Sequence, residues 1–102
     1  MSEKIVRIAE LEIDPARLDA YRALLSEEIE ASIALEPGVL MLHAVSKKAQ
    51  PELIRILEIH AGREAYEAHL GMPHFLKYKR ETADMVRSLR LIDVDPIMMR
   101  AK

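Results

Sequence analysis

Residues 36–60 read EPGVLMLHAVSKKAQPELIRILEIH, and this stretch decides the fold class. The Glu-Pro-Gly triplet at 36–38 ends a preceding helix, because Pro cannot continue a helix and Gly suits the exit from one. Two β-rich runs follow at 39–46 and 53–60, with a turn-like segment at 47–52 between them. The pattern predicts a β-hairpin in the middle of the chain.

The segment before the hairpin predicts a strand and then a helix. Residues 4–13 alternate in the manner of a strand. Asp14-Pro15 then supplies an N-cap followed by Pro at the first helical position. Apolar residues follow at helical spacing and predict an amphipathic helix with the stripe Leu18, Tyr21, Leu25, Ile29 and Ile33.

The segment after the hairpin predicts a broken helix and a last strand. Residues 63–70 form a short helical pattern, which Gly71-Met72-Pro73 interrupts. A second helix restarts at Pro73, and residues 90–99 return to strand character, bent or ended near Pro96. The stripe of the second helix is predicted as Phe75, Tyr78, Thr82, Met85, Val86 and Leu89.

The predicted order is therefore strand, helix, strand, strand, broken helix, strand. This is the ferredoxin-like βαββαβ arrangement, an α+β fold with a four-stranded antiparallel sheet. The chain has 102 residues, half of them apolar, so we expect residues 1–102 to form a single domain.

The two hairpin strands are apolar on both sides, unlike strands that have one face in water. The sheet face away from the helices therefore needs a cover. In so short a chain, we expect a second copy to supply it about a two-fold axis, as a homodimer. The alternative is a monomer whose C-terminal strand and tail shield that face.

Composition excludes several classes of partner. Fifteen Lys and Arg against seventeen Asp and Glu leave a net charge of −2, which argues against nucleic acid or an anionic membrane as the main partner. The absence of Cys excludes disulfides and thiolate chemistry and fits a cytoplasmic location. Because the chain starts directly in a strand pattern and lacks a long apolar run, we expect neither export nor a membrane span.

Glu58 and the four histidines are the residues most suited to chemistry. If the hairpin pairs Ser46 with Leu53, then His43, Glu58 and His60 share one face of the sheet. A slip of one residue in this pairing would move the side chains of one strand to the opposite face. A buried carboxylate is costly without a partner, so Glu58 is predicted to have one or to line a cavity. The alternative is a strand-end carboxylate in water or in a structural salt bridge.

His69 and His74 are candidate bases. His69 is predicted on the inward stripe of the short helix together with Tyr66. His74 starts the next helix, where the positive end of the helix dipole favours a neutral imidazole, and a neutral imidazole accepts protons. The alternative for each is a packed, hydrogen-bonded core residue.

Neither a metal nor an organic cofactor is expected. His69 and His74 are five apart across a Pro break, a spacing that fits neither a helical HExxH site nor a zinc finger. The three glycines are too far apart for a phosphate-cradling loop. Lys77, Lys79 and Arg80 form a basic spot that suits either an anionic group of a substrate or an ordinary solvated helix face.

Four motifs together resemble the antibiotic biosynthesis monooxygenase family over nearly the whole chain. They are the Glu-Pro-Gly turn at 36–38, Glu58, the AYEAHL segment at 65–70 and the Pro-His-Phe helix start at 73–75. The resemblance implies a dimeric α+β barrel, with a cavity between sheet and helices in each subunit. It also implies an oxidoreductase, a cofactor-independent monooxygenase that oxidises a small aromatic phenol, quinol or polyketide-like substrate with dioxygen.

The resemblance also implies roles for individual residues. Glu58, His69 and His74 match the family's recurrent polar positions and would be catalytic, with His69 or His74 as the base. The residues predicted to contact the substrate are Tyr66, Phe75, Tyr78 and His43, of which His43 comes from the strand-face reasoning and lies outside the family pattern.

The same fold hosts other activities, so two further readings stay open. Heme-degrading relatives depend on Asn, Trp and His. This sequence has neither Asn nor Trp, which argues against heme degradation. Another branch isomerises a phosphorylated sugar derived from autoinducer-2 and shares the Glu and paired His positions. A third possibility is a non-catalytic dimeric module that binds a small molecule.

Overall fold

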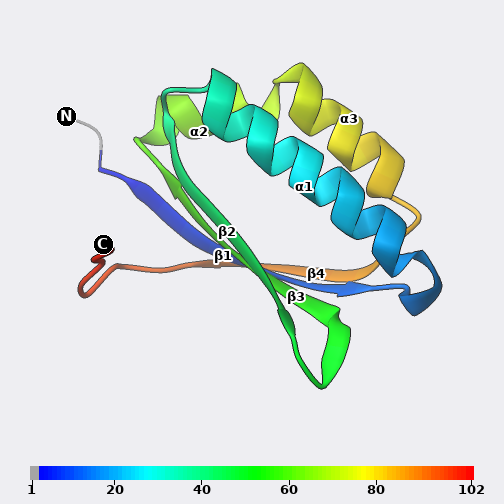
Figure 1. Ribbon diagram of the computed structural model, residues 1–102. Coiled ribbons are helices and arrows are strands. Elements are labelled where there is room, and N and C mark those ends of the chain that lie inside the picture. The colour runs from blue at the N-terminus through cyan, green and yellow to red at the C-terminus, as the bar shows by residue number, and fades with distance from the viewer. Residues whose placement is uncertain (1–2) are drawn as a thin grey trace.

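The computed structural model describes residues 3–102 and has the expected ferredoxin-like order. One antiparallel sheet has the strand order β2-β3-β1-β4, and Figure 1 shows the helices on one face of it. The predicted α+β fold class is therefore confirmed. The elements are β1 (Ile5–Ile13), a short 3-10 turn η1 (Pro15–Arg17), α1 (Leu18–Leu35), β2 (Val39–Lys47), β3 (Gln50–His60), α2 (Arg63–Leu70), α3 (Pro73–Thr82) and β4 (Val86–Asp93).

The chain enters α1 through the predicted Asp14-Pro15 cap. The Asp14 side chain accepts a 3.0 Å hydrogen bond from the backbone N–H of Ala16, and Pro15 opens the 3-10 turn that leads into α1. The inward face of α1 differs from the predicted apolar stripe. It ends in polar residues, since Glu28 and Ser32 are buried while Ile33 is 48% exposed. This polar end of α1 lies over the part of the sheet where the candidate site forms.

The predicted register of the hairpin is wrong by one residue. Ser46 pairs with Ile54, because both strands extend into the expected turn and leave a two-residue connection. A shift by one residue exchanges the faces of a strand. His43 pairs with Leu57 and lies on the opposite face of the sheet from Glu58, where it is exposed. The prediction that His43 shares a face with Glu58 is therefore wrong.

The C-terminal boundary also differs from the prediction. The expected helix through Leu89 ends at Thr82, and β4 covers Val86–Asp93 instead of residues 90–99. Met85, which was assigned to the helix stripe, is a buried core residue just outside the helix. The segment pairs antiparallel with β1, with Val86 opposite Ile13 at the start of the pairing. This pairing provides hydrogen-bond partners for the backbone N–H and C=O groups of the segment. Tertiary pairing therefore overrides a pattern that also fits a helix.

The core lies between the sheet and the helices. It consists of Ala9, Leu11, Ile13, Tyr21, Leu25, Ile54, Ile56 and Met85. The other sheet face carries Val45, which is 65% exposed, together with partly exposed apolar side chains such as Ile8 and Leu57. Within residues 3–102, no helix has both the length and the apolar character needed to cross a bilayer.

Gly38, in the turn before β2, permits a close approach to α2. A Cβ atom at this position would lie 2.5 Å from the Cβ of Ala65, which is closer than two carbon atoms can pack. We expect Gly38→Ala to lower the free energy of unfolding by about 1–3 kcal/mol through overpacking. Urea titration checks this, with Gly71→Ala as the control, because a Cβ there would meet nothing closer than 3.8 Å. Equal destabilisation by both substitutions would contradict the steric explanation.

Candidate active site

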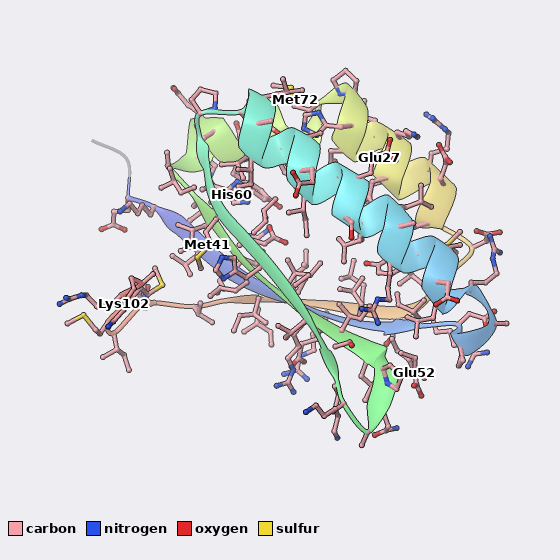
Figure 2. All side chains as sticks on the ribbon, viewed as in Figure 1. Glu27, Met41, Glu52, His60, Met72 and Lys102 are labelled. Carbon is pink, nitrogen blue, oxygen red and sulfur yellow. The ribbon has the colours of Figure 1, made fainter. Side chains whose placement is uncertain are left out.

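A cavity of about 690 Å³ lies between the sheet and the helices. Its walls combine apolar side chains with a few polar ones, which is the usual composition of a small-molecule site. The apolar part includes Leu25, Leu42, Ile56 and Phe75, and the polar part includes Arg7, Glu28, Glu58, Tyr66, His69 and Tyr78. Figure 2 shows side chains in the space between α1 and the sheet, with His60 labelled near α2.

Glu36 connects the two candidate bases. It is the residue that caps the C-terminus of α1, and Pro37 after it ends that helix. Its Oε2 atom accepts hydrogen bonds from His69 Nδ1 at 2.9 Å and from His74 Nε2 at 2.6 Å. A carboxylate can only accept, so both of these ring nitrogens carry hydrogen. In a neutral ring, His69 Nε2 therefore keeps its lone pair.

The two imidazoles also keep Glu36 ionised. Burial alone would raise the pKa of this carboxyl, which is 5% exposed, but the hydrogen bonds from His69 and His74 outweigh burial and lower the pKa below its usual range. Glu36 thus provides a permanent negative charge behind His69.

Glu28 faces His69 from the other side. Its Oε1 atom lies 3.6 Å from His69 Nε2 and accepts a 2.6 Å hydrogen bond from Ser32 Oγ. Burial raises the pKa of Glu28, and the bond from Ser32 and the nearby histidines offset this only in part. The imidazole of His69 therefore lies between two buried carboxyl groups, one hydrogen-bonded to Nδ1 and one facing Nε2.

A second polar group lies across the cavity. The Arg7 guanidinium stacks 4.6 Å from the centre of the Tyr66 ring, donates a hydrogen bond to its hydroxyl and donates a 2.9 Å bond from Nε to Asp93. Burial would lower the pKa of Arg7, but the bond to Asp93 and the proximity of Tyr66 raise it, so the guanidinium stays charged. Next to this pair, Glu58 lies 3.2 Å from Nε2 of the fully buried His60.

The His60 ring connects the two polar groups. Its centre lies 5.2 Å from that of Tyr66 and 5.2 Å from that of His69. Phe75 contacts His69 from the α3 side, with ring centres 4.8 Å apart. Aromatic rings thus surround the imidazole of His69 and restrict its orientation.

A pair of hydroxyls forms another part of the wall. Tyr21 and Tyr78 share a 2.6 Å hydrogen bond between their hydroxyl oxygens. Burial raises the pKa of Tyr21 to about 12, and it raises the pKa of Tyr78 further, with the neighbouring Tyr21 hydroxyl adding to the effect. Both hydroxyls are neutral at physiological pH.

The raised pKa of Tyr21 predicts a loss of stability in alkali. A group whose folded pKa lies above its unfolded value stabilises the fold below the unfolded pKa, which is about 10 for Tyr. The contribution of Tyr21 is therefore lost as pH rises from 10.0 toward about 12. Urea midpoints measured across this range should fall more steeply for the unmodified chain than for Tyr21→Phe. If the urea midpoints of the two proteins fell equally with pH, the loss of stability could not be assigned to ionisation of Tyr21.

The structure brings most of the predicted site residues to one cavity. Glu58, Tyr66, His69, Phe75 and Tyr78 all line it. Two predicted residues lie elsewhere. His74 is hydrogen-bonded to Glu36 rather than placed on the cavity wall, and His43 lies on the other face of the sheet.

Sequence reasoning missed three polar residues of the site. Glu28 has a signal in retrospect, because it follows Tyr21 by seven positions and Leu25 by three and so falls on the apolar stripe of α1. Arg7 has a similar signal. It lies two residues before the inward-facing Ala9 in a strand, so the two side chains point to the same face of the sheet. For Glu36 the sequence predicts only a place in a turn, and nothing local indicates that its side chain reaches His69 on α2 and His74 on α3.

A second hollow, of about 720 Å³, lies at the far end of the hairpin. Its polar lining consists of the surface side chains Glu10, Glu12, Ser46, Lys47, Arg55, Ser88 and Arg90. Arg55 and Arg90 already lie close to Glu10, and none of the four histidines lines this hollow. It therefore lacks the buried pair of histidine and carboxylate that the other cavity has, and the cavity at His69 is the candidate active site.

Three solved structures illustrate the similarity to known proteins. A candidate antibiotic biosynthesis monooxygenase from Bacteroides thetaiotaomicron is 49% identical, with a TM-score of 0.96, and the match covers 98% of this chain and 97% of that one. Candidate enzymes of the same name from Nitrosomonas europaea (18% identity, TM-score 0.86, 95% and 93% covered) and Caulobacter crescentus (19%, 0.87, 95% and 92%) share the fold.

A comparison with proteins of curated function found no significant match. The model of the family described as antibiotic biosynthesis monooxygenase matches residues 4–81. That range contains Glu36, Glu58, His69 and His74 and most of the elements that build the cavity. Because the match spans most of the chain and the 49% identical structure carries the same description, this chain belongs to the antibiotic biosynthesis monooxygenase family.

Proposed function

We propose that the protein is a cofactor-independent monooxygenase that oxidises a small aromatic phenol, quinol or polyketide-like substrate with dioxygen. The observation that carries the proposal is His69 on the cavity wall, with Nδ1 held by the buried Glu36 and Nε2 left to accept a proton. Family membership adds support for oxygen chemistry. In a cavity of about 690 Å³, a substrate of one to three fused rings has room to bind.

Proton transfer to His69 is the first step of the proposed reaction. A phenol with its hydroxyl at Nε2 gives up its proton to the imidazole, and Glu36 stabilises the imidazolium that results. On the opposite side, the charged Arg7 guanidinium favours the developing phenolate through its field. The proposed roles are His69 as the base, Glu36 as the positioning residue and Arg7 as the electrostatic stabiliser.

The phenolate then reduces dioxygen itself. One electron passes from phenolate to dioxygen, and the phenoxyl radical and superoxide combine at a ring carbon that bears hydrogen, para to the oxygen in a simple phenol and ortho to it in a quinol, forming a C–O bond. Proton transfers give a hydroperoxide, which loses that carbon's hydrogen and the outer oxygen as water and leaves a quinone. The sum is phenol plus dioxygen to quinone plus water, or quinol plus dioxygen to hydroxyquinone plus water, and both balance without an external reductant. The apolar walls keep bulk water away from the intermediates.

Oxygen consumption tests the proposal directly. Chelator-treated protein without flavin should consume oxygen with members of a panel of hydroquinones, naphthols and anthrones, and mass spectrometry should find the quinone with one oxygen atom from ¹⁸O₂. Boiled protein and substrate alone measure autoxidation. No protein-dependent uptake across the panel would remove the proposal.

We also propose that the protein acts as a homodimer, with the uncovered sheet faces of two copies packed together. Val45 on that face is 65% exposed, and Ile8 and Leu57 on the same face are partly exposed, so an isolated chain would leave these apolar side chains in contact with water. Light scattering should give twice the 11.6 kDa mass of the chain. A particle of single-chain mass at micromolar concentration would contradict this proposal.

One observation favours the isomerase as the second candidate function. Lys79 and Arg87 line the cavity and place positive charge where a phosphate could bind. An isomerase would convert a phosphorylated sugar equally well without oxygen, so mass spectrometry or NMR of that sugar after incubation under nitrogen separates the two functions. A purely binding role needs no base, whereas His69 and Glu58 both line the cavity.

A further inference from the structure

Glu28, His69 and His74 form a compact group of potential metal ligands. One carboxylate oxygen and one ring nitrogen from each histidine all lie within 4.8 Å of one another. The 3.6 Å separation of Glu28 Oε1 and His69 Nε2 exceeds a normal hydrogen bond. It is close to the distance of about 3.4 Å between two ligands on a tetrahedral zinc ion with bonds of about 2.1 Å. A small ion fits between these two atoms, and binding to the third residue, His74, requires the ligand atoms, which lie within 4.8 Å of one another, to move closer together.

The outer contacts of these three residues match those of known metal sites. Ligating imidazoles donate their other N–H to a carboxylate, and ligating carboxylates accept further hydrogen bonds. Here Glu36 accepts from His69 Nδ1 and His74 Nε2, and Ser32 donates to Glu28. These contacts leave His69 Nε2 and His74 Nδ1 as the nitrogens with free lone pairs. The three ligand side chains are therefore already oriented by the surrounding structure.

Burial and charge also suit a divalent cation. Glu28 is 6% exposed and His69 is 3% exposed, and both line the cavity, from which water can complete the coordination. Within residues 3–102, no Lys or Arg forms a salt bridge with Glu28 or Glu36. Two carboxylates on either side of the imidazoles can balance a charge of +2.

We propose that Glu28, His69 and His74 bind a divalent transition-metal ion, with Zn²⁺ as the best fit, in a site supported by Glu36 and Ser32. The spacing of His69 and His74 alone had argued against a metal, but the third ligand comes from α1, which is distant in the sequence. A bound ion would occupy His69 Nε2. If the proposed oxygenase reaction holds, metal binding therefore switches that reaction off by blocking the base.

Calorimetric titration of chelator-treated protein with ZnCl₂ tests the site. We expect one ion per chain and a Kd in the micromolar range or below, with no comparable binding of Mg²⁺, which prefers oxygen ligands. Glu28→Gln should weaken Zn²⁺ binding at least about tenfold. Glu27→Gln, one residue earlier on α1 and on the surface, should leave the affinity unchanged, as should His43→Ala. Co²⁺ should give the intense visible bands of a tetrahedral site, and these should be lost in Glu28→Gln.

Several results would overturn the metal site. Zn²⁺ affinity that is unaffected by Glu28→Gln, or lowered equally by Glu27→Gln, would do so, as would binding that is lost only in His43→Ala. If Glu28→Gln fails to fold by circular dichroism, His74→Gln replaces it with the same expected weakening. Because binding is measured without substrate, tight Zn²⁺ binding in a protein that never consumes oxygen would support the site and count against the oxygenase proposal alone.

Discussion

His69→Ala should lower the rate of protein-dependent oxygen uptake by roughly 100-fold to 10,000-fold, the usual contribution of a positioned general base. The substitution removes the imidazole on the cavity wall that is proposed as the base, and His74 cannot take its place, since it is hydrogen-bonded to Glu36 and does not line the cavity. Oxygen-electrode rates measured with a substrate found in the panel provide the test.

Two measurements separate chemistry from folding for this variant. His43→Ala is the matched control, because it removes an exposed imidazole from the opposite face of the sheet and should leave the rate unchanged. The His69→Ala protein should keep the circular dichroism spectrum and the mass in solution of the unmodified protein. A variant that fails to fold would instead support a structural role for His69, and one that folds with full activity would exclude His69 as the base.

Ile13→Ala should lower the free energy of unfolding by about 2–5 kcal/mol, the range observed for large-to-small changes in well-packed cores. Ile13 is 0% exposed at the end of β1 and belongs to the core cluster that includes Tyr21 and Met85. The truncation leaves a cavity that these rigid neighbours cannot fill. Urea unfolding at a fixed protein concentration measures the loss, since self-association would make stability depend on concentration.

Ile33→Ala makes the same chemical change at a position that is 48% exposed on α1. It should cost less than about 1 kcal/mol, because little buried area is lost. Ile13 does not line the cavity, so folded Ile13→Ala protein should retain its oxygen uptake per molecule at low temperature. Similar destabilisation by both substitutions would contradict the assignment of Ile13 to the core.

The site shows where local sequence patterns lose their predictive value. The inward positions of Tyr66, His69, Phe75 and Tyr78 follow from helical periodicity, and the structure places all four on the cavity wall. The hydrogen-bond partner of His69 does not follow from periodicity. Glu36 occupies a chain turn, and its contact with His69 exists only because α1 ends above α2.

The sequence by itself determined the order of the elements, the fold class and the helical residues that face the cavity, because each depends on local periodicity, caps and breakers. The family followed from the resemblance of its motifs. Only the tertiary structure decided the hairpin register, the boundary between α3 and β4, and the grouping of Glu28, Glu36, His69 and His74. Strand pairing and contacts between distant segments are set by the packing of the whole chain. A one-residue slip changes nothing in the local pattern but moves His43 to the other face of the sheet.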